Sequence, residues 1–141
     1  MNEIHIRLAD WKNDQAVLRR IREAVFIAEQ AVPAELEWDA DDATAAHFLA
    51  FEGEYPMGTA RLLPDGHIGR VAVLKDWRGL HVGDKLMRAV IEEAEKRGLK
   101  QQMLSAQVQA SAFYERFGFA VVSDEFLDAG IPHVDMVRHS H

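Results

Sequence analysis

A buried strand that leads through a glycine-containing loop directly into a helix is the feature that most constrains what this chain can be. The pattern lies in residues 71–87, where an apolar strand is followed by Gly79, Gly83 and a long amphipathic helix. The first turn of a helix leaves its N–H groups without intrahelical partners and carries partial positive charge, so a loop of small residues there can hold a phosphate. The spacing fits neither the G-x-G-x-x-G dinucleotide fingerprint nor the P-loop. At this level, phosphate binding and a tight strand-to-helix turn with glycines for packing both stay open.

The rest of the hydrophobic pattern predicts an α/β chain with a mixed, mostly antiparallel sheet flanked by helices. With 141 residues the chain has the size of one domain, so we expect a single domain over residues 1–141. Strands are predicted at residues 4–8, 47–51, 57–63, 68–74, 103–106, 119–122 and 133–137. Helices are predicted at residues 14–32, 82–97 and 110–117. One face of the long helix is expected to be buried: Val82, Leu86, Met87, Val90, Ile91 and Ala94.

The composition excludes several classes of function. The chain has 16 Lys and Arg residues against 23 Asp and Glu residues, and this net charge of −7 would repel the phosphates of a nucleic acid. The absence of cysteine excludes disulfides, thiolate zinc sites, iron–sulfur ligation and a cysteine nucleophile. The N-terminal residues lack the pattern of a signal peptide, and no stretch of about 18 apolar residues is present. We therefore expect a soluble cytoplasmic protein without a membrane partner.

The strand–loop–helix segment resembles a motif of the GNAT N-acetyltransferase family. That motif reads Q/R-x-x-G-x-G/A, and here Arg78 and Gly83 fall on it while His81 takes the position of its first glycine. The six residues of the match are Arg78, Gly79, Leu80, His81, Val82 and Gly83. The resemblance implies the GNAT acyl-CoA N-acyltransferase fold, with acetyl-CoA as co-substrate and no metal.

Two sets of backbone N–H groups acquire roles through this resemblance. Those from Leu80 to Gly83 would hold the pyrophosphate of acetyl-CoA at the start of the helix. Those of the preceding strand would polarise the thioester carbonyl, as an oxyanion hole does, at a point where members of the family have a splayed or bulged strand. The residues that carry this second set are Val71, Ala72 and Val73.

A second segment resembles the family independently of the first. Residues 110–119 are similar to its A-x-x-F-Y-x-x-x-G-F element. The resemblance implies that Tyr114 lies near the thioester sulfur, where its phenol would donate a proton to the departing thiolate of coenzyme A. The alternative is a half-buried aromatic side chain whose hydroxyl group contacts water. Gln107, at a position where many relatives have Asn, would contact the co-substrate through its amide.

Similarity to the ElaA/YjcF-like subgroup of the family extends over nearly the whole chain. It rests on residues 25–33, on Glu37, Asp39 and His47, and on Gly130-Ile131-Pro132-His133. This subgroup is defined mostly by sequence, so the similarity supports the fold more than it identifies an acceptor.

The reaction that the resemblance implies is direct transfer of an acetyl group to a primary amine in a ternary complex. The absence of a cysteine nucleophile agrees with direct transfer. Five side chains compete to take the proton from the substrate ammonium group: Glu29, Glu37, Asp39, His47 and His133. We expect Glu29 to be this base, since it ends the first helix beside an acidic segment, and we expect Glu29 and His133 to bind the acceptor. Six acids between residues 29 and 42 favour a cationic amine, of a small molecule or a peptide.

Other interpretations stay open at the level of the sequence. A non-catalytic domain that binds or senses acyl-CoA would keep the phosphate loop and lose the acceptor chemistry. A metal-binding protein would use His133, His139 and His141, although a chain end is a poor place for a fixed site. A late strand edge could also pair with a second copy in a homodimer.

Overall fold

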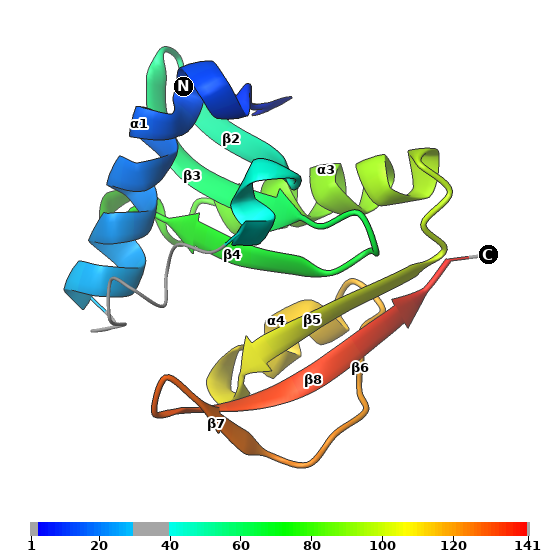
Figure 1. The fold of residues 1–141 in the computed structure, drawn as a ribbon. Coiled ribbons are helices and arrows are strands. Elements are labelled where there is room, and N and C mark those ends of the chain that lie inside the picture. Colours follow the sequence, from blue (N-terminus) through cyan, green and yellow to red (C-terminus); the bar gives the residue numbers. More distant parts are fainter. Residues whose placement is uncertain (1–2, 30–39, 141) are drawn as a thin grey trace.

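The chain folds into two antiparallel sheets, each of four strands, that lie next to one another (Figure 1). The computed structural model describes residues 3–29 and 40–140. The first sheet has the strand order β1 (Ile4–Leu8), β2 (Ala46–Glu52), β3 (Tyr55–Leu62), β4 (Ile68–Val73). In the second sheet, β8 (Ile131–His139) pairs on one side with β5 (Gln101–Gln107) and on the other with β6 (Ala120–Val121) and β7 (Phe126–Asp128).

Helices cover both faces of the first sheet and one face of the second. Helix α1 (Trp11–Arg22) continues into a π-helix, η1 (Glu23–Glu29), and packs on β3 and β4. Helix α3 (Val82–Lys96) packs on β1, β2, β3 and β4, and the short α4 (Ser111–Glu115) contacts β5 and β6. Three 3₁₀ turns complete the order: η2 (Ala40–Ala43), η3 (Lys75–Trp77) and η4 (Val108–Ala110). None of the helices in the described part of the chain is long and apolar enough to cross a membrane.

The buried face of α3 joins the two sheets into one core. All six residues predicted for this face are buried, which confirms the helical periodicity read from the sequence. They pack in one apolar cluster with Phe48 and Met57 from the first sheet and with Leu104 and Met136 from the second. Burying one such side chain fully contributes about 1.5–3 kcal/mol. Because the cluster buries many of them from both sheets, it holds the sheets together.

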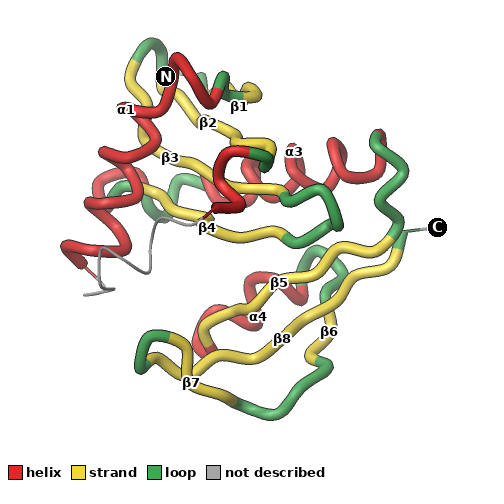
Figure 2. Tube along the Cα trace, in the orientation of Figure 1, coloured by secondary structure: helices red, strands yellow, loops and turns green. Residues whose placement is uncertain are grey.

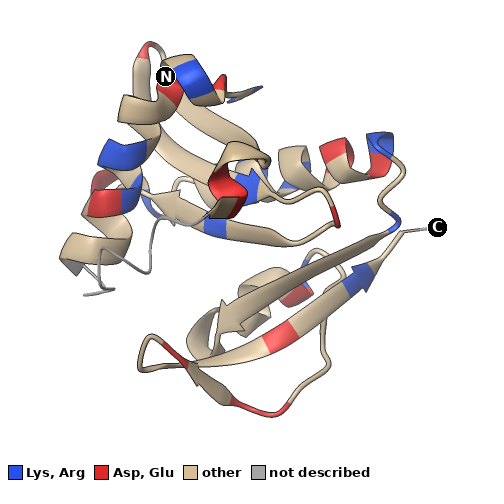
Figure 3. Cartoon of the chain, in the orientation of Figure 1, with Lys and Arg blue, Asp and Glu red and all other residues tan. Residues whose placement is uncertain are grey.

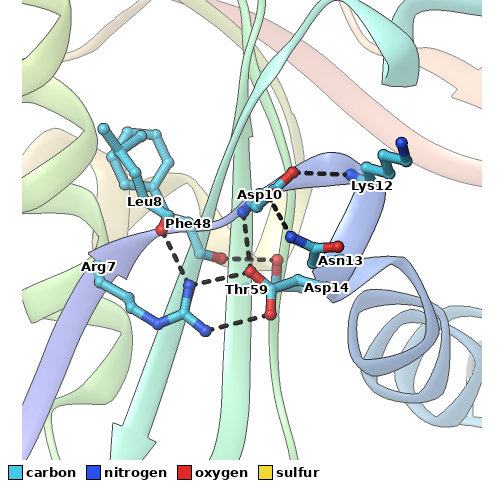
Figure 4. Close-up of polar contacts among 8 residues, drawn as sticks. All are labelled: Arg7, Leu8, Asp10, Lys12, Asn13, Asp14, Phe48 and Thr59. Atoms are coloured by element: carbon cyan, nitrogen blue, oxygen red, sulfur yellow. Dashed lines mark hydrogen bonds and ion pairs between the residues drawn. The ribbon is translucent and has the colours of Figure 1, made fainter.

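Helix α1 begins at Trp11 rather than at the predicted Asp14, because its N-terminus is capped (Figure 4). The side chain of Asp10 accepts a hydrogen bond from the N–H of Lys12 at 3.1 Å. Asp14 accepts bonds from the N–H of Asp10 at 2.8 Å and from the guanidinium of Arg7 at 2.9 and 3.1 Å. The hydrogen bonds from Arg7 lower the pKa of Asp14, so the carboxylate that fixes this corner stays charged.

A buried charge cluster lies where α1 meets β2 and β3. Arg22 and Arg61 share one carboxylate, with Arg22 Nη1 at 2.7 Å and Arg61 Nη1 at 3.0 Å from Asp42 Oδ1. His47 Nε2 lies 2.7 Å from the carbonyl oxygen of Asp42, and its ring stacks on Trp11 with centroids 4.6 Å apart. All four ionisable side chains are buried. Asp42 is one of the six acids that the sequence offered in favour of a cationic acceptor, but it is a buried counter-ion.

The predicted order of elements is confirmed except near the end of the chain. The predicted strand at residues 119–122 is shorter, Ala120–Val121, and the last strand is longer, Ile131–His139. The three residues of β7 were not predicted as a strand, since they show no alternation of buried and exposed side chains. The predicted first helix changes to π geometry at Glu23, which hydrophobic periodicity does not reveal.

Replacing Asp42 with Asn should destabilise the protein by about 3 kcal/mol, because removing one partner from a buried ion pair leaves buried charge without compensation. Asp41→Asn is the matched control, since the neighbouring Asp41 is exposed and its substitution should change stability by less than about 0.5 kcal/mol. Urea unfolding followed by circular dichroism measures both variants. Equal midpoints for the two would show that Asp42 contributes no more than a surface acid.

Candidate active site

The two sheets meet at one end and separate at the other, which opens a cavity between β4 and β5. They touch where His67 and Met103 form an isolated parallel bridge and the N–H of Met103 donates to the carbonyl of Gly66 at 3.1 Å. Beyond this point the strands diverge (Figures 1 and 2). The cavity between them has a volume of about 460 Å³ and is lined by residues of both strands.

A bulge in β4 accompanies this divergence. Thr59 pairs with Ala72 and Arg61 with Gly69, so Arg70 and Val71 together oppose a single residue of β3. Arg70 has φ of 51°, in the left-handed region, which costs an L-residue about 1–2 kcal/mol. A bulge bends its strand and increases the local twist, so β4 turns away from β5 here. The prediction of a bulged strand at this position is confirmed.

The cavity brings together four of the residues predicted from the sequence. Its described lining includes Val71 from β4, Gln107 from β5, Tyr114 from α4 and His133 from β8. It also includes residues that the sequence analysis missed: Phe26, Arg61, Arg70 and Asp128. Phe26 comes from the π-helix and Arg61 from a buried strand position, and neither carries a local sequence signal. Of the residues in β4 and β5, Arg70 is the one with a charged side chain (Figure 3).

The backbone of β4 offers hydrogen-bonding groups to the cavity side. The N–H of Leu74 donates to the carbonyl of Met57 in β3 at 2.8 Å. Because successive residues of a strand point their N–H groups in opposite directions, those of Val71 and Val73 face away from β3, whereas that of Ala72 faces it. Of the three predicted donors, Val71 is in the described lining of the cavity. Ala72 is buried against α1, and the carbonyl of Val73 accepts a bond from Nε of Arg78 at 2.9 Å.

Tyr114 lies on the α4 side of the cavity among aromatic neighbours. Its ring makes edge-to-face contacts with Phe113, at 5.0 Å between centroids, and with Phe119, at 6.3 Å. Burial raises the pKa of the Tyr114 phenol to about 12, since a desolvated phenolate is disfavoured. The phenol is therefore protonated at neutral pH and can serve as a proton donor.

His133 lies on the β8 side of the same cavity with one ring nitrogen already engaged. Nδ1 is 2.7 Å from the carbonyl oxygen of Ile131, so Nδ1 carries the proton of the neutral ring. The ring stacks on Phe126 with centroids 6.1 Å apart, which fixes its plane. In this tautomer Nε2 keeps a lone pair and can accept a proton.

The loop before α3 ends in an uncapped helix N-terminus. Gly79 has φ of 81°, a conformation that suits glycine, and His81 follows in the left-handed region with φ of 64° as the N-cap residue. The His81 side chain makes no capping bond, and the helix ladder starts with the N–H of Lys85 donating to the carbonyl of His81 at 3.1 Å. The N–H groups before Lys85 thus have no intrahelical acceptor. A Cβ on Gly83 would lie 3.3 Å from Cζ of Phe113, so this glycine lets α4 approach the helix start.

The other predicted bases are placed less favourably or lie outside the described residues. Glu29 ends the π-helix, and its side chain, like Glu37 and Asp39, is not among the parts that the structure describes. His47 is absent from the described lining of the cavity; it is buried in the charge cluster, and burial lowers its pKa. His133 and His139 are six residues apart on one strand, about 20 Å, too far to share a metal ion.

Comparison with known proteins identifies the family. The model of the acetyltransferase (GNAT) domain matches residues 8–140. The chain belongs to the GNAT acetyltransferase family. YjcF of Bacillus subtilis (strain 168), an uncharacterized N-acetyltransferase, is 42% identical over 122 residues, which cover 84% of this chain and 87% of YjcF. The crystal structure of Escherichia coli ElaA has a TM-score of 0.85 and 31% identity, over 97% of this chain and 99% of that one.

A third comparison concerns a ligand. The crystal structure of a GNAT family acetyltransferase from Elizabethkingia anophelis, solved with acetyl-CoA bound, has a TM-score of 0.74 over 99% of both chains. Its identity to this chain is 15%, so the likeness is one of fold. The GNAT fold and the similarity to ElaA and YjcF that the sequence predicted are thus confirmed.

This chain departs from the GNAT motif at a position where the backbone conformation favours glycine. His81 occupies the first glycine position of the motif, and its φ of 64° is one that a residue with a Cβ adopts at a cost. Its imidazole is largely exposed and lies 3.5 Å from Asp84, a contact that adds little to stability at this exposure. The left-handed backbone conformation that favours glycine is therefore present at this position, and His81 strains it.

Replacing His81 with Gly should stabilise the protein by roughly 0.5–1 kcal/mol, because it relieves the left-handed strain at some cost in the entropy of the unfolded chain. His81→Ala removes the imidazole and keeps the Cβ, so it should bring no such gain. Thermal unfolding of the three proteins distinguishes the backbone effect from a side-chain effect. An equal gain in both variants would mean that the imidazole, and not the backbone, is unfavourable.

Proposed function

We propose that this protein is an acetyl-CoA-dependent N-acetyltransferase that moves an acetyl group to a primary amine of a small molecule or peptide by direct transfer in a ternary complex. The observation that carries the proposal is the cavity between β4 and β5, where the backbone of the bulged strand, Tyr114 and His133 face one space. Proton donor, proton acceptor and carbonyl-polarising groups are the set that acyl transfer to an amine requires.

The start of α3 supports binding of the donor through its pyrophosphate. The N–H groups of Val82 and Gly83 precede the first helix bond and carry the positive end of the helix dipole. The missing side chain of Gly83 brings the Phe113 ring of α4 close to this point, and the next residue, Tyr114, lines the cavity. A donor with its phosphates at α3 and its thioester in the cavity fits this arrangement, and acetyl-CoA has that chemistry. The acetyl-CoA held by the Elizabethkingia relative agrees with this assignment.

The residues of the cavity divide the reaction between them. The N–H groups of Val71 and Val73 polarise the thioester carbonyl while the amine nitrogen bonds to its carbon. Tyr114 donates its proton to the sulfur as the carbon–sulfur bond breaks, and the phenolate then takes the proton that the new amide nitrogen releases. Burial raises the pKa of Tyr114 to about 12, so the phenol keeps its proton until the departing sulfur carries the negative charge that can take it.

The acceptor amine must lose a proton before it attacks, and two groups are proposed for that step. His133 Nε2 has a lone pair on the cavity side of β8, because Nδ1 holds the ring proton against Ile131. Glu29, at the end of the π-helix that also supplies Phe26 to the cavity, is the second candidate. Gln107 pairs with His133 across β5 and β8 and would contact the donor beside it.

An isothermal titration with acetyl-CoA tests the donor site, with ATP and NAD as controls. We expect saturable binding of acetyl-CoA alone. Gly83→Leu should weaken it by about tenfold or more, because the new side chain crowds both the phosphate-binding turn and Phe113. Gly83→Ala, which the family motif allows, should stay within about threefold of the wild type. Equal binding of ATP, or an unchanged Kd in a folded Gly83→Leu variant, would refute the assignment.

Tyr114→Phe should lower kcat by about a hundredfold and leave the Kd for acetyl-CoA nearly unchanged, because it removes a proton donor and little contact area. Steady-state kinetics with any amine that gives turnover measures this. In the wild type, Tyr114 with a pKa of about 12 is protonated at lower pH, so kcat should show no alkaline fall below about pH 11. Full activity of Tyr114→Phe would show that the hydroxyl is dispensable.

The acidic limb of the same pH profile assigns the base. Activity should rise with pH as the base loses its proton, and the variant that lacks the base should lose this limb. His133→Gln and Glu29→Gln are the pair to compare, since each keeps a polar side chain of similar size. A limb that persists in both would exclude both residues.

A further inference from the structure

We propose that Trp77 is the positioning residue of the pyrophosphate-binding loop. The β2–β3 hairpin holds the Trp77 side chain in place. The inference rests on the proposed function, since it assumes that the N–H groups at the start of α3 bind the donor's pyrophosphate. The positioning acts on the backbone of residues 78–83, and Trp77 itself contacts neither phosphate nor the reacting atoms.

Trp77 is the half-buried point at which this loop is attached to the body of the protein, next to a bond that Nε of Arg78 donates to the carbonyl of Val73 at 2.9 Å. Every residue from Lys75 to His81 is exposed except Trp77, which is half-buried and packs against the main apolar cluster. Its backbone N–H donates to the carbonyl of Leu74 at 2.9 Å, which closes the turn directly after β4. The loop is therefore fixed at one end by Trp77 and at the other by the buried Val82 of α3.

The hairpin holds the indole by two different contacts. Trp77 Nε1 donates to Oε2 of Glu52, the last residue of β2, at 3.1 Å. The indole stacks on the ring of Tyr55, the first residue of β3, with centroids 4.9 Å apart and an angle of 13° between the planes. Tyr55 is braced in turn by Arg20 of α1, whose guanidinium lies 5.4 Å from the ring centroid and donates to the carbonyl of Pro56 at 3.0 Å. The stack and the charge-assisted bond together set both the plane and the depth of the indole.

The residues between these two fixed ends need such support. His81 has a left-handed conformation that is unfavourable for a residue with a Cβ, and Gly79 is intrinsically permissive. A strained conformation persists only where its surroundings determine it, so a loop released at Trp77 would populate other conformations. A ligand that needs the ordered loop then binds more weakly in proportion to the fraction of molecules that remain ordered.

The test compares two acetyl donors that differ at the pyrophosphate. Acetyl-CoA contains it, and S-acetylpantetheine lacks it and keeps the thioester arm. Trp77→Phe keeps an aromatic ring for the stack on Tyr55 and removes the bond to Glu52, and Glu52→Met removes the same bond from the other side. Both variants should bind acetyl-CoA about tenfold more weakly, with S-acetylpantetheine within about twofold of the wild type. NMR titration measures dissociation constants from the micromolar to the millimolar range for both donors.

Two further variants separate positioning from general stability. Trp11→Phe is the matched control, because Trp11 also stacks on a neighbouring ring, that of His47, but lies away from the loop. It should lower the melting temperature and leave the ratio of the two dissociation constants unchanged. Glu52→Gln keeps an oxygen that accepts from the indole and should retain most of the wild-type ratio.

The possible results separate this inference from the proposed function. A wild-type protein that binds neither donor refutes the proposed function, and the inference with it. A wild-type protein that prefers acetyl-CoA, with the same ratio in folded Trp77→Phe and Glu52→Met, refutes the inference alone. Equal weakening of both donors would show that Trp77 supports the whole fold and has no special effect on the loop.

Discussion

The structure depends on one interruption in its hydrogen bonding, the point at which β4 diverges from β5. If the two strands paired along their whole length, the two sheets would be one and the backbone groups of β4 would be satisfied within it. The bulge at Arg70 and Val71 bends β4 away, so pairing with the second sheet ends at the bridge between His67 and Met103. An edge of this kind is normally a liability, and here it faces a cavity that a ligand can fill. The site is therefore a consequence of an incomplete sheet.

A sheet interrupted in this way must be held together by other interactions. The apolar cluster centred on α3 does this, because its buried residues come from both sheets and from the helix between them. At the far side of the first sheet, α1 packs through a separate cluster that includes Leu18, Ile21 and Leu49. The cavity is thus lined by strands whose positions are set by packing on their outer faces. Packed interiors resist small displacements, so the cavity is largely formed before a ligand arrives.

The sequence predicted the parts of this protein that local patterns determine. The buried face of α3 follows from helical periodicity, and the turn at Gly79 and the aromatic pair Phe113 and Tyr114 belong to short motifs. The burial of Asp42 was not predictable, because it depends on Arg22 and Arg61, which lie 20 and 19 residues away in the chain. The π-helix that carries Phe26 to the cavity was missed for a similar reason, since its hydrogen-bond shift leaves no trace in the order of apolar residues. Long-range pairing, not local propensity, decided these positions.

The ion pairs of Asp42 also change what the acidic segment predicts about the charge of the acceptor. A count of acids between residues 29 and 42 suggests a strongly negative cleft, but the carboxylate of Asp42 is already shared by two arginines inside the protein. Such a carboxylate does little to attract a cationic amine, because its field is cancelled within a few ångströms. Among the cavity-lining residues that the structure describes, the acid is Asp128, the exposed last residue of β7. Asp128 in β7 lies across from the start of β8, the strand that carries His133. The charge that would attract the proposed ammonium acceptor and one of the groups proposed to deprotonate it therefore come from one side of the cavity.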